Sequence, residues 1–320
     1  MRDNSQINEA SSNKRLRSTL AHDYAYLGMK IFSRIYLFKR IYLFFSRLSS
    51  RALISSENNL ICDKAVELKN NFSVSEVVET IKKDGFCSNI QLNQDLVDDI
   101  LEFSESNRCY AYGDSKWGFY LSQIRDCEVK LDKKILIANY LNYQEKNIFN
   151  NFINSPVLTT IAKQYLGNSA RNIATQLWWT FPADVDAMTR SKAAHYFHRD
   201  VDAWAFIKFF FYITPVEEGG GPHVYVKGSH RPHTSAQIFK EKLLINRHDD
   251  TSIRARFGDD SISPIYGTGG AGIIADTFGF HKGESPEKNP RLMLCAVYAT
   301  RDYGEQEFEI DPDTLESYDA

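Results

Sequence analysis

The chain has 320 residues, of which 43% are hydrophobic and 25% charged, and its formal net charge is −3. Such a composition indicates a globular protein of one large or two small domains, and it gives no case for nucleic-acid binding, which calls for a basic surplus. Five scattered cysteines without a C-x-x-C pair exclude a disulfide framework or zinc ribbon and favour a reducing, cytoplasmic location.

Residues 1–70 predict a polar tail followed by a basic, aromatic helical segment. Residues 1–23 lack the apolar core of a secretory signal. Residues 24–54 contain six Lys or Arg and no acid, and their uncharged runs are too short for a spanning helix. Two interpretations stay open: the segment packs on its own domain or a partner subunit, or it makes weak peripheral contact with a membrane surface. The basic residues fall on several sides of a helical wheel, which favours packing.

Residues 71–320 read as one domain that begins with helices. Apolar residues spaced from Val74 to Ile81 predict a helix that stops at Gly85 and leads into a short strand. Asn93 is a suitable N-cap for the next helix. A further helical zone is expected from about residue 144 to 166, with Gly167 just past its end.

After Asn172 the pattern changes to strands. β-branched and aromatic runs bounded by Pro, Gly and Asp predict strands in residues 172–181, 203–214, 222–229, 271–278 and 291–300. One helical insertion is expected at about 235–247. Strands that follow a helical part predict a mainly β domain, a sandwich or jelly roll with helices packed outside.

The stretch "HYFHRDVDAW", residues 195–204, contains a candidate metal site. On a strand, residues two apart point to the same face, so His198 and Asp200 can converge on one point. A histidine and a carboxylate so placed supply two of three ligands for a non-haem ferrous ion, which keeps open positions for a cosubstrate and dioxygen. Alone, the pair is a weak signal, and a structural or surface role is the favoured interpretation. His281, at the end of a predicted strand, stands out as the third ligand.

Three further polar residues lie in or beside predicted strands. Arg291 opens an apolar strand, where an arginine is costly to bury unless an anion meets it, and its fork matches a carboxylate. Lys208 shares the inward alternation of its strand, so it either reaches an edge or meets an anion such as a cosubstrate or an acidic substrate group. Gln176 is a weaker candidate for the same pocket.

The order H-x-D, then His281, then Arg291 ten residues on, resembles the iron(II)- and 2-oxoglutarate-dependent dioxygenases. "GGGPHVYVKGSHR", residues 219–231, and "KDGFCSNIQLNQDLVDDILEF", residues 83–103, resemble segments of the phytanoyl-CoA dioxygenase family. The resemblance covers roughly residues 75–300 and leaves out the basic segment. It implies a double-stranded β-helix, a cupin-like jelly roll, with iron on His198, Asp200 and His281 and the 2-oxoglutarate carboxylate on Arg291.

The same resemblance implies hydroxylation of a small-molecule or acyl substrate, with dioxygen consumed and succinate and CO2 released. In related halogenases a small residue replaces the carboxylate ligand, so Asp200 favours hydroxylation over halogenation. Other histidines are not expected to bind the metal: His195 falls on the opposite strand face, and His223 and His230 are assigned to the turn near the pocket. The alternative function is a non-catalytic jelly-roll binding or scaffold protein associated with a membrane.

Overall fold

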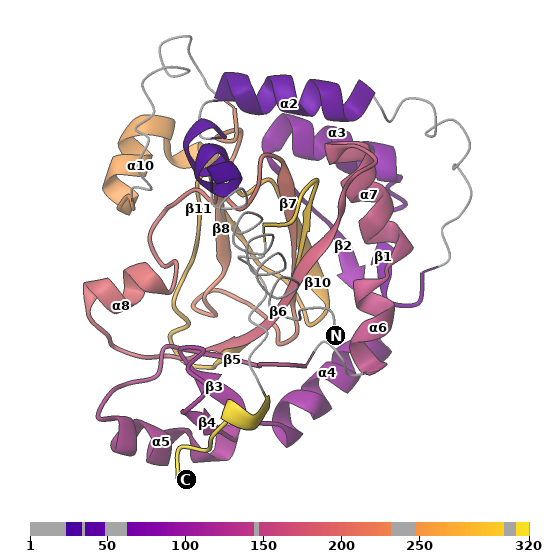
Figure 1. Ribbon diagram of the computed structural model, residues 1–320. Helices are drawn as coiled ribbons and strands as arrows, with labels where there is room; N and C mark the ends of the chain where they lie inside the picture. Colours follow the sequence, from indigo (N-terminus) through magenta and orange to yellow (C-terminus); the bar gives the residue numbers. More distant parts are fainter. Residues whose placement is uncertain are drawn as a thin grey trace, which may run out of the picture.

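Two antiparallel sheets form the body of the protein in the computed structural model, which describes residues 24–33, 36–48, 63–143, 147–231, 247–303 and 312–319. The larger sheet contains β1 (Val66–Leu68), β2 (Phe86–Leu92), β3 (Cys109–Ala111), β4 (Gly118–Phe119), β5 (Ile137–Asn139), β6 (Arg171–Thr180), β7 (Phe206–Tyr212), β10 (Ala271–Ala275) and β12 (Arg291–Ala299). The smaller contains β8 (His223–Val226), β9 (Ile262–Ile265) and β11 (His281–Gly283). Their orders are β1-β2-β10-β7-β12-β6-β5-β3-β4 and β11-β8-β9 (Figure 1).

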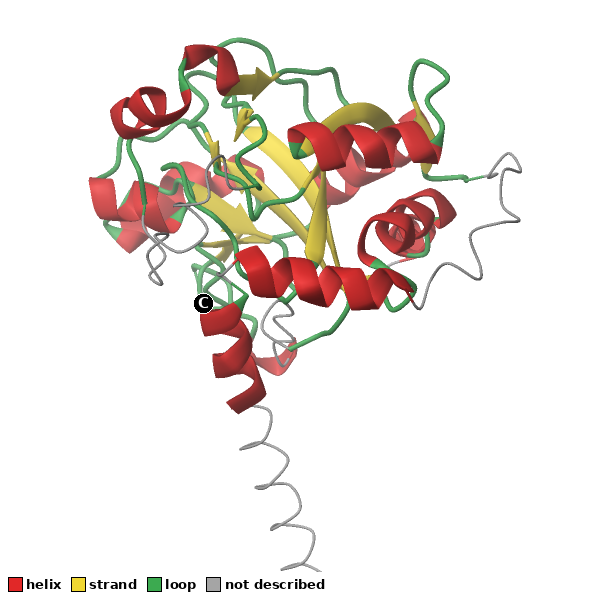
Figure 2. Ribbon diagram, turned by 90° about the horizontal axis from the view of Figure 1, so that it is seen from above, coloured by secondary structure: helices red, strands yellow, loops and turns green. Residues whose placement is uncertain are grey.

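Helices surround the strands when the molecule is seen from above (Figure 2). They are α2 (Tyr36–Leu48), α3 (Val74–Asp84), α4 (Gln94–Ser106), α5 (Ile124–Leu131), α6 (Asn147–Ile153), α7 (Pro156–Leu166), α8 (Ala187–Lys192) and α10 (Asp250–Phe257), and residues 24–32 are also helical. In the described part of the chain, no helix is both long enough and apolar enough to cross a membrane.

Local sequence explains where α3 begins and ends. Ser73 and Glu76 form a reciprocal capping box at its start. Gly85 ends it in the left-handed region, with φ +91°, which only glycine adopts at little cost. A Cβ at this position would lie 2.4 Å from the Tyr225 hydroxyl oxygen, so the turn also permits close packing against β8.

Alternation along the strands separates two cores. On β7, Ile207, Phe209 and Phe211 pack outward with the apolar faces of α3, α4, α6 and α7. Phe210 and Tyr212 pack inward among the residues between the two sheets. Because successive side chains of a strand point to opposite faces, Lys208 shares the inward side with Phe210.

This architecture is the predicted jelly roll, mainly β with flanking helices, and β6, β7, β8, β10 and β12 confirm the five predicted strands. The helical zone at 144–166 is two helices, α6 and α7, because Ser155 caps a new helix that starts with Pro156. The short strands β1, β3, β4, β5 and β9 were not predicted, and His281, expected at the end of the strand that starts at Ala271, instead opens β11. The insertion at 235–247 lies almost wholly outside the described residues, as does the tail.

The predicted boundary at residue 70 separates a tail segment from the domain of residues 71–320 and stays a prediction. β1 precedes this boundary and pairs with β2, with Val66 opposite Leu92. The helix α2 also packs near α7. Both elements of the first segment are therefore in contact with the elements that follow it.

Candidate metal centre

The backbone brings three residues from distant parts of the chain to one point. His198 and His281 form an isolated antiparallel bridge, and each N–H donates to the other's carbonyl, at 3.0 and 3.1 Å. The Asp200 N–H donates to the Thr277 carbonyl at 2.9 Å. One ligand atom from each of His198, Asp200 and His281 lies within 4.8 Å of the others, close enough for a single ion to reach all three.

Hydrogen bonds orient both imidazole rings with Nε2 toward the carboxylate. His198 Nδ1 is 2.9 Å from the Tyr196 carbonyl oxygen, and His281 Nδ1 is 3.0 Å from that of Gly279. A carbonyl only accepts, so each Nδ1 donates, and Nε2 is the ring nitrogen directed at the metal position. His198 Nε2 lies 3.5 Å and His281 Nε2 3.3 Å from the oxygens of Asp200.

Burial and neighbouring charges place His198 and Asp200 in the protonation states that a metal requires. Burial, and then the neighbouring His281, lower the pKa of His198 to about 4, so its ring is neutral at neutral pH. Burial alone would raise the pKa of Asp200, but Lys208 and His281 outweigh it and hold that pKa well below the ordinary value. The donor set is thus two imidazoles and one carboxylate, which suits ferrous iron.

Lys208 does face the interior, as its alternation on β7 predicts. Its Nζ lies 2.9 Å from Asp200 Oδ2 and 2.8 Å from Asp202 Oδ2. The anions that it meets are therefore carboxylates of the protein itself, one of them a candidate ligand. Its assignment to cosubstrate binding stays a prediction. Asp202 was not identified from the sequence, although it continues the two-residue alternation of His198 and Asp200.

Arg291 is buried at the start of β12, with 3% of its surface exposed. It donates through Nη1 to the Gly221 carbonyl and through Nη2 to Thr180 Oγ1, the latter at 3.1 Å. Its buried Nε has no hydrogen-bond partner among the described residues. The guanidinium is thus held in place by the protein and keeps donor capacity for an anion.

His223 belongs to the same site, although the sequence assigned it to a turn. It is 4% exposed, and its cross-strand partner is Gly283. Its ring stacks on His281 at 5.5 Å between centroids and makes a tilted contact with Phe210 at 4.7 Å. Burial, then His281 and Arg291, lower its pKa well below the ordinary value. Its buried Nε2 has no partner within the described structure. His223 lies on β8, which pairs with β11, the strand that starts at His281. This position is the signal that could have identified His223 as a residue of the site.

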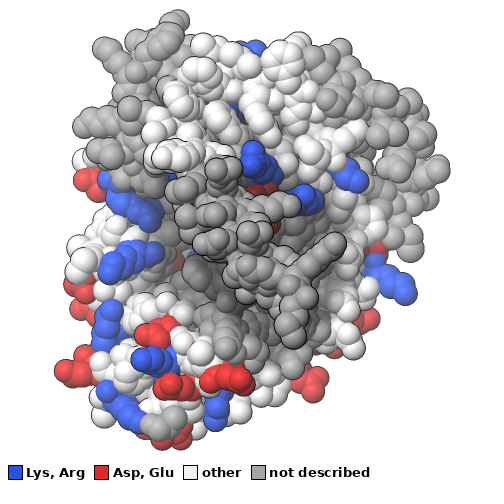
Figure 3. All heavy atoms as spheres, in the orientation of Figure 1, with Lys and Arg blue, Asp and Glu red and all other residues white. Residues whose placement is uncertain are grey.

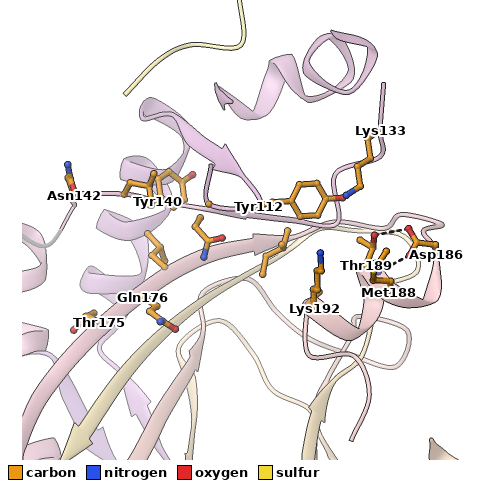
Figure 4. Close-up of a pocket in the computed structure, with 16 residues that line it drawn as sticks. Tyr112, Lys133, Tyr140, Asn142, Thr175, Gln176, Asp186, Met188, Thr189 and Lys192 are labelled. Carbon is orange, nitrogen blue, oxygen red and sulfur yellow. Dashed lines mark hydrogen bonds between the residues drawn. The ribbon is translucent and has the colours of Figure 1, made fainter. Parts of the chain in front are cut away.

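Gln176 lies on β6 opposite Cys295 and lines a cavity of about 470 Å³. Figure 4 shows Tyr112 and Lys133 on one side of this cavity and Lys192 of α8 on another. None of the three candidate metal ligands is among the residues that line it. The structure therefore places Gln176 at a cavity, and its contact with a cosubstrate stays a prediction.

The remaining histidines of the motif region have other partners. His195 Nδ1 is 2.7 Å from Ser285 Oγ, and His230 Nε2 is 3.2 Å from the Lys82 carbonyl oxygen. Neither belongs to the group of three that could hold an ion. His233, expected to be exposed, lies outside the described residues.

Fold and site together define a jelly-roll protein with a candidate centre of two histidines and one carboxylate. No family model matches the chain, and no curated protein matches it in sequence. Among solved structures it is similar to the non-haem α-ketoglutarate-dependent epimerase SnoN from nogalamycin biosynthesis, at 13% identity over 72% of this chain and 86% of that one, with TM-score 0.46.

Two other solved structures are similar to a comparable degree. EctD from S. alaskensis with bound Fe is 16% identical over 80% of this chain and 92% of that one, with TM-score 0.46. HygX from Streptomyces hygroscopicus with nickel, 2-oxoglutarate and hygromycin B is 12% identical over 70% and 86%, with TM-score 0.43. Each TM-score is below 0.5, so the chemistry of the site has to follow from this chain's own residues.

Proposed function

We propose that this protein is an Fe(II)- and 2-oxoglutarate-dependent oxygenase of the phytanoyl-CoA dioxygenase type, which hydroxylates a small-molecule or acyl substrate. The observation that carries the proposal is the convergence of His198, Asp200 and His281 within 4.8 Å with both histidine Nδ1 atoms already bonded to carbonyls. Two neutral imidazoles and one carboxylate with open positions are the ligand set of non-haem ferrous oxygenases. When bound, ferrous iron and 2-oxoglutarate supply the activation of dioxygen that hydroxylation requires.

The chain's own residues then have separate tasks. The three ligands hold the metal, and Lys208 fixes the carboxylate of Asp200 through an ion pair with its Oδ2 atom. Arg291 orients the far carboxylate of 2-oxoglutarate, because a buried fork with a free donor is complementary to that group. His223 offers a neutral Nε2 near the cosubstrate, and inward aromatic residues such as Phe210 exclude water.

Binding experiments test this proposal without knowledge of the substrate. We expect 2-oxoglutarate to bind the Fe(II) protein under anaerobic conditions and to produce a weak visible charge-transfer band. His281→Ala should remove the band and sharply weaken Fe(II) binding, whereas His230→Ala, a buried histidine outside the site, should keep both. A non-catalytic scaffold would have no affinity for 2-oxoglutarate, and that result would refute the proposal.

Substrate turnover is a second, independent readout. We expect succinate release from 2-oxoglutarate to rise when pools of small-molecule or acyl substrates are added, and His198→Ala to abolish it. Asp200→Ala should also abolish hydroxylation, since it removes the anionic ligand. Chlorination of a substrate with Asp200 in place would contradict the assignment as a hydroxylase.

A further inference from the structure

The helix α2 carries two different apolar faces. Its inner face, formed by Lys39, Tyr42, Leu43 and Ser46, packs toward the domain. Its outer face is a second stripe at helical spacing, Leu37, Phe38, Ile41, Phe44 and Phe45, and each of these side chains is at least 42% exposed. Packing on its own domain, which the sequence favoured, therefore does not explain the apolar side chains on the outer face of this helix.

The preceding helical residues, 24–32, extend the exposed stripe. Tyr24, Leu27, Ile31 and Phe32 are 40% to 72% exposed, and Phe32 contacts Phe38 edge to face at 5.6 Å between centroids. The two helices thus form one surface, the apolar patch, made of residues 24, 27, 31, 32, 37, 38, 41, 44 and 45. Nine of the thirteen exposed large hydrophobic residues in the described structure belong to it, so these residues are concentrated rather than scattered.

The inward lysines explain why a helical wheel gave a poor amphipathic split. Lys39 is buried and lies 3.0 Å from Asp276, and Lys30 Nζ donates to the Val201 carbonyl at 2.6 Å. Both cations point to the domain and not to solvent. Because neither lysine lies on the outer face, the apolar patch is not interrupted by their charges, and Arg40 is exposed beside it.

The charge of residues 24–54 indicates what binds to the apolar patch. Residues 24–54 carry six Lys or Arg and no acid. Lys30 and Lys39 face the domain, which leaves four arginines, among them the exposed Arg40. An apolar helical face combined with basic residues is the pattern of interfacial helices on anionic lipid. In Figure 3 the upper part of the visible face, where α2 lies, is mostly uncharged with a few basic side chains, whereas Asp and Glu gather mainly lower down. We propose that the apolar patch is a docking surface for an anionic membrane.

The same two helices contact residues that are adjacent in sequence to the candidate metal ligand Asp200 and to its backbone partner Thr277. Val201, which accepts from Lys30, directly follows Asp200, and Asp276, which pairs with Lys39, precedes Thr277, the residue that accepts from the Asp200 N–H. Docking of the apolar patch would therefore hold the metal centre close to the two helices that face the lipid. The proposal itself does not depend on the oxygenase function, because it is tested without iron or 2-oxoglutarate.

Vesicle binding of the full chain is the test. The protein is mixed with vesicles of phosphatidylcholine alone, or of phosphatidylcholine with an equal amount of phosphatidylserine, and flotation gives the bound fraction. We expect binding to the anionic vesicles that weakens as salt is raised. The double variant Phe44→Ser, Phe45→Ser should lower the partition coefficient by about 10-fold for each aromatic removed, and Arg40→Gln by about 5-fold on the anionic vesicles only.

The matched control is Val129→Ser, Tyr266→Ser, which removes two exposed apolar side chains elsewhere on the surface and should leave binding unchanged. All five replaced side chains are exposed, so the variants should keep the far-ultraviolet circular dichroism and melting temperature of the wild type. Absence of binding to anionic vesicles, or equal binding by the Phe44, Phe45 variant, would overturn the proposal. A dimer in sedimentation that these two substitutions abolish would assign the apolar patch to a second copy of the chain instead, which would also overturn it.

Discussion

Lys39→Met tests whether a buried ion pair fastens α2 to the domain. The Lys39 and Asp276 side chains are only 5% and 3% exposed. Lys39 Nζ lies 3.0 and 3.2 Å from the two carboxylate oxygens and 4.2 Å from the ring centroid of Phe278. Methionine keeps the apolar stem of the lysine and removes the charge. The substitution therefore leaves Asp276 buried without its cation.

The expected loss follows from what Asp276 retains. Removal of one partner of a buried pair costs about 3–5 kcal/mol, because the other charge stays desolvated. The Tyr165 hydroxyl at 2.7 Å and the Phe278 N–H at 3.1 Å still donate to the carboxylate. We therefore expect a loss near the lower limit, about 3 kcal/mol in the free energy of unfolding. Arg40→Met, at an exposed position of the same helix, should cost less than about 0.5 kcal/mol.

The pH dependence has a definite sign. Burial would raise the pKa of Asp276, but Lys39 outweighs it and lowers that pKa, so in the wild type this carboxylate stabilises the fold at neutral pH and the contribution is lost as pH falls through the lowered pKa. In the Lys39→Met variant the effect of burial dominates, and we expect the pKa of Asp276 to rise above its ordinary value. As pH falls, Asp276 therefore binds a proton in the variant before it does so in the wild type. The difference in the free energy of unfolding between the two proteins should narrow as pH falls from about 7 to about 4.

Urea denaturation followed by circular dichroism, at several pH values, measures both effects. The double variant Lys39→Met, Asp276→Asn should recover most of the loss, since no buried charge remains. A loss below about 1 kcal/mol, as for an exposed pair, or a difference that does not change with pH, would refute the reasoning.

Three further predictions concern the site. Arg291→Ala should weaken 2-oxoglutarate binding to the Fe(II) protein by about 30-fold to several thousand-fold, and Arg291→Lys should recover only part of it; unchanged affinity in titrations would exclude Arg291 as the carboxylate partner. Lys208→Met should destabilise the metal-free protein by about 3–5 kcal/mol, with Co(II) restoring part of the melting temperature; no response to Co(II) would show that the carboxylates are not at a metal site. His223→Phe keeps the ring stacking and should leave the melting temperature nearly unchanged while lowering 2-oxoglutarate affinity by about 10-fold or more; equal affinity would remove His223 from the cosubstrate pocket.

Local patterns in the sequence determined most elements of this fold. Capping at Ser73 and the stop at Gly85 depend on residues within a few positions, so α3 could be bounded without tertiary information. The alternation of β7 likewise placed Lys208 on the inward side of its strand, because the period of a strand is a local property. The three-residue strands β3 and β5 were missed, since so few residues carry no periodicity.

Partners across the sheets were decided only by the tertiary structure. The sequence named His281 and Arg291, but only strand pairing shows that His281 lies opposite His198 and that His223 stacks beside it. Long-range ion pairs are equally invisible in a local pattern: Lys39 and Asp276 are 237 residues apart. A helical wheel counts the charge of Lys39 on the surface of the helix, whereas the fold buries that charge against a carboxylate, and this difference is what leaves the outer face of α2 apolar.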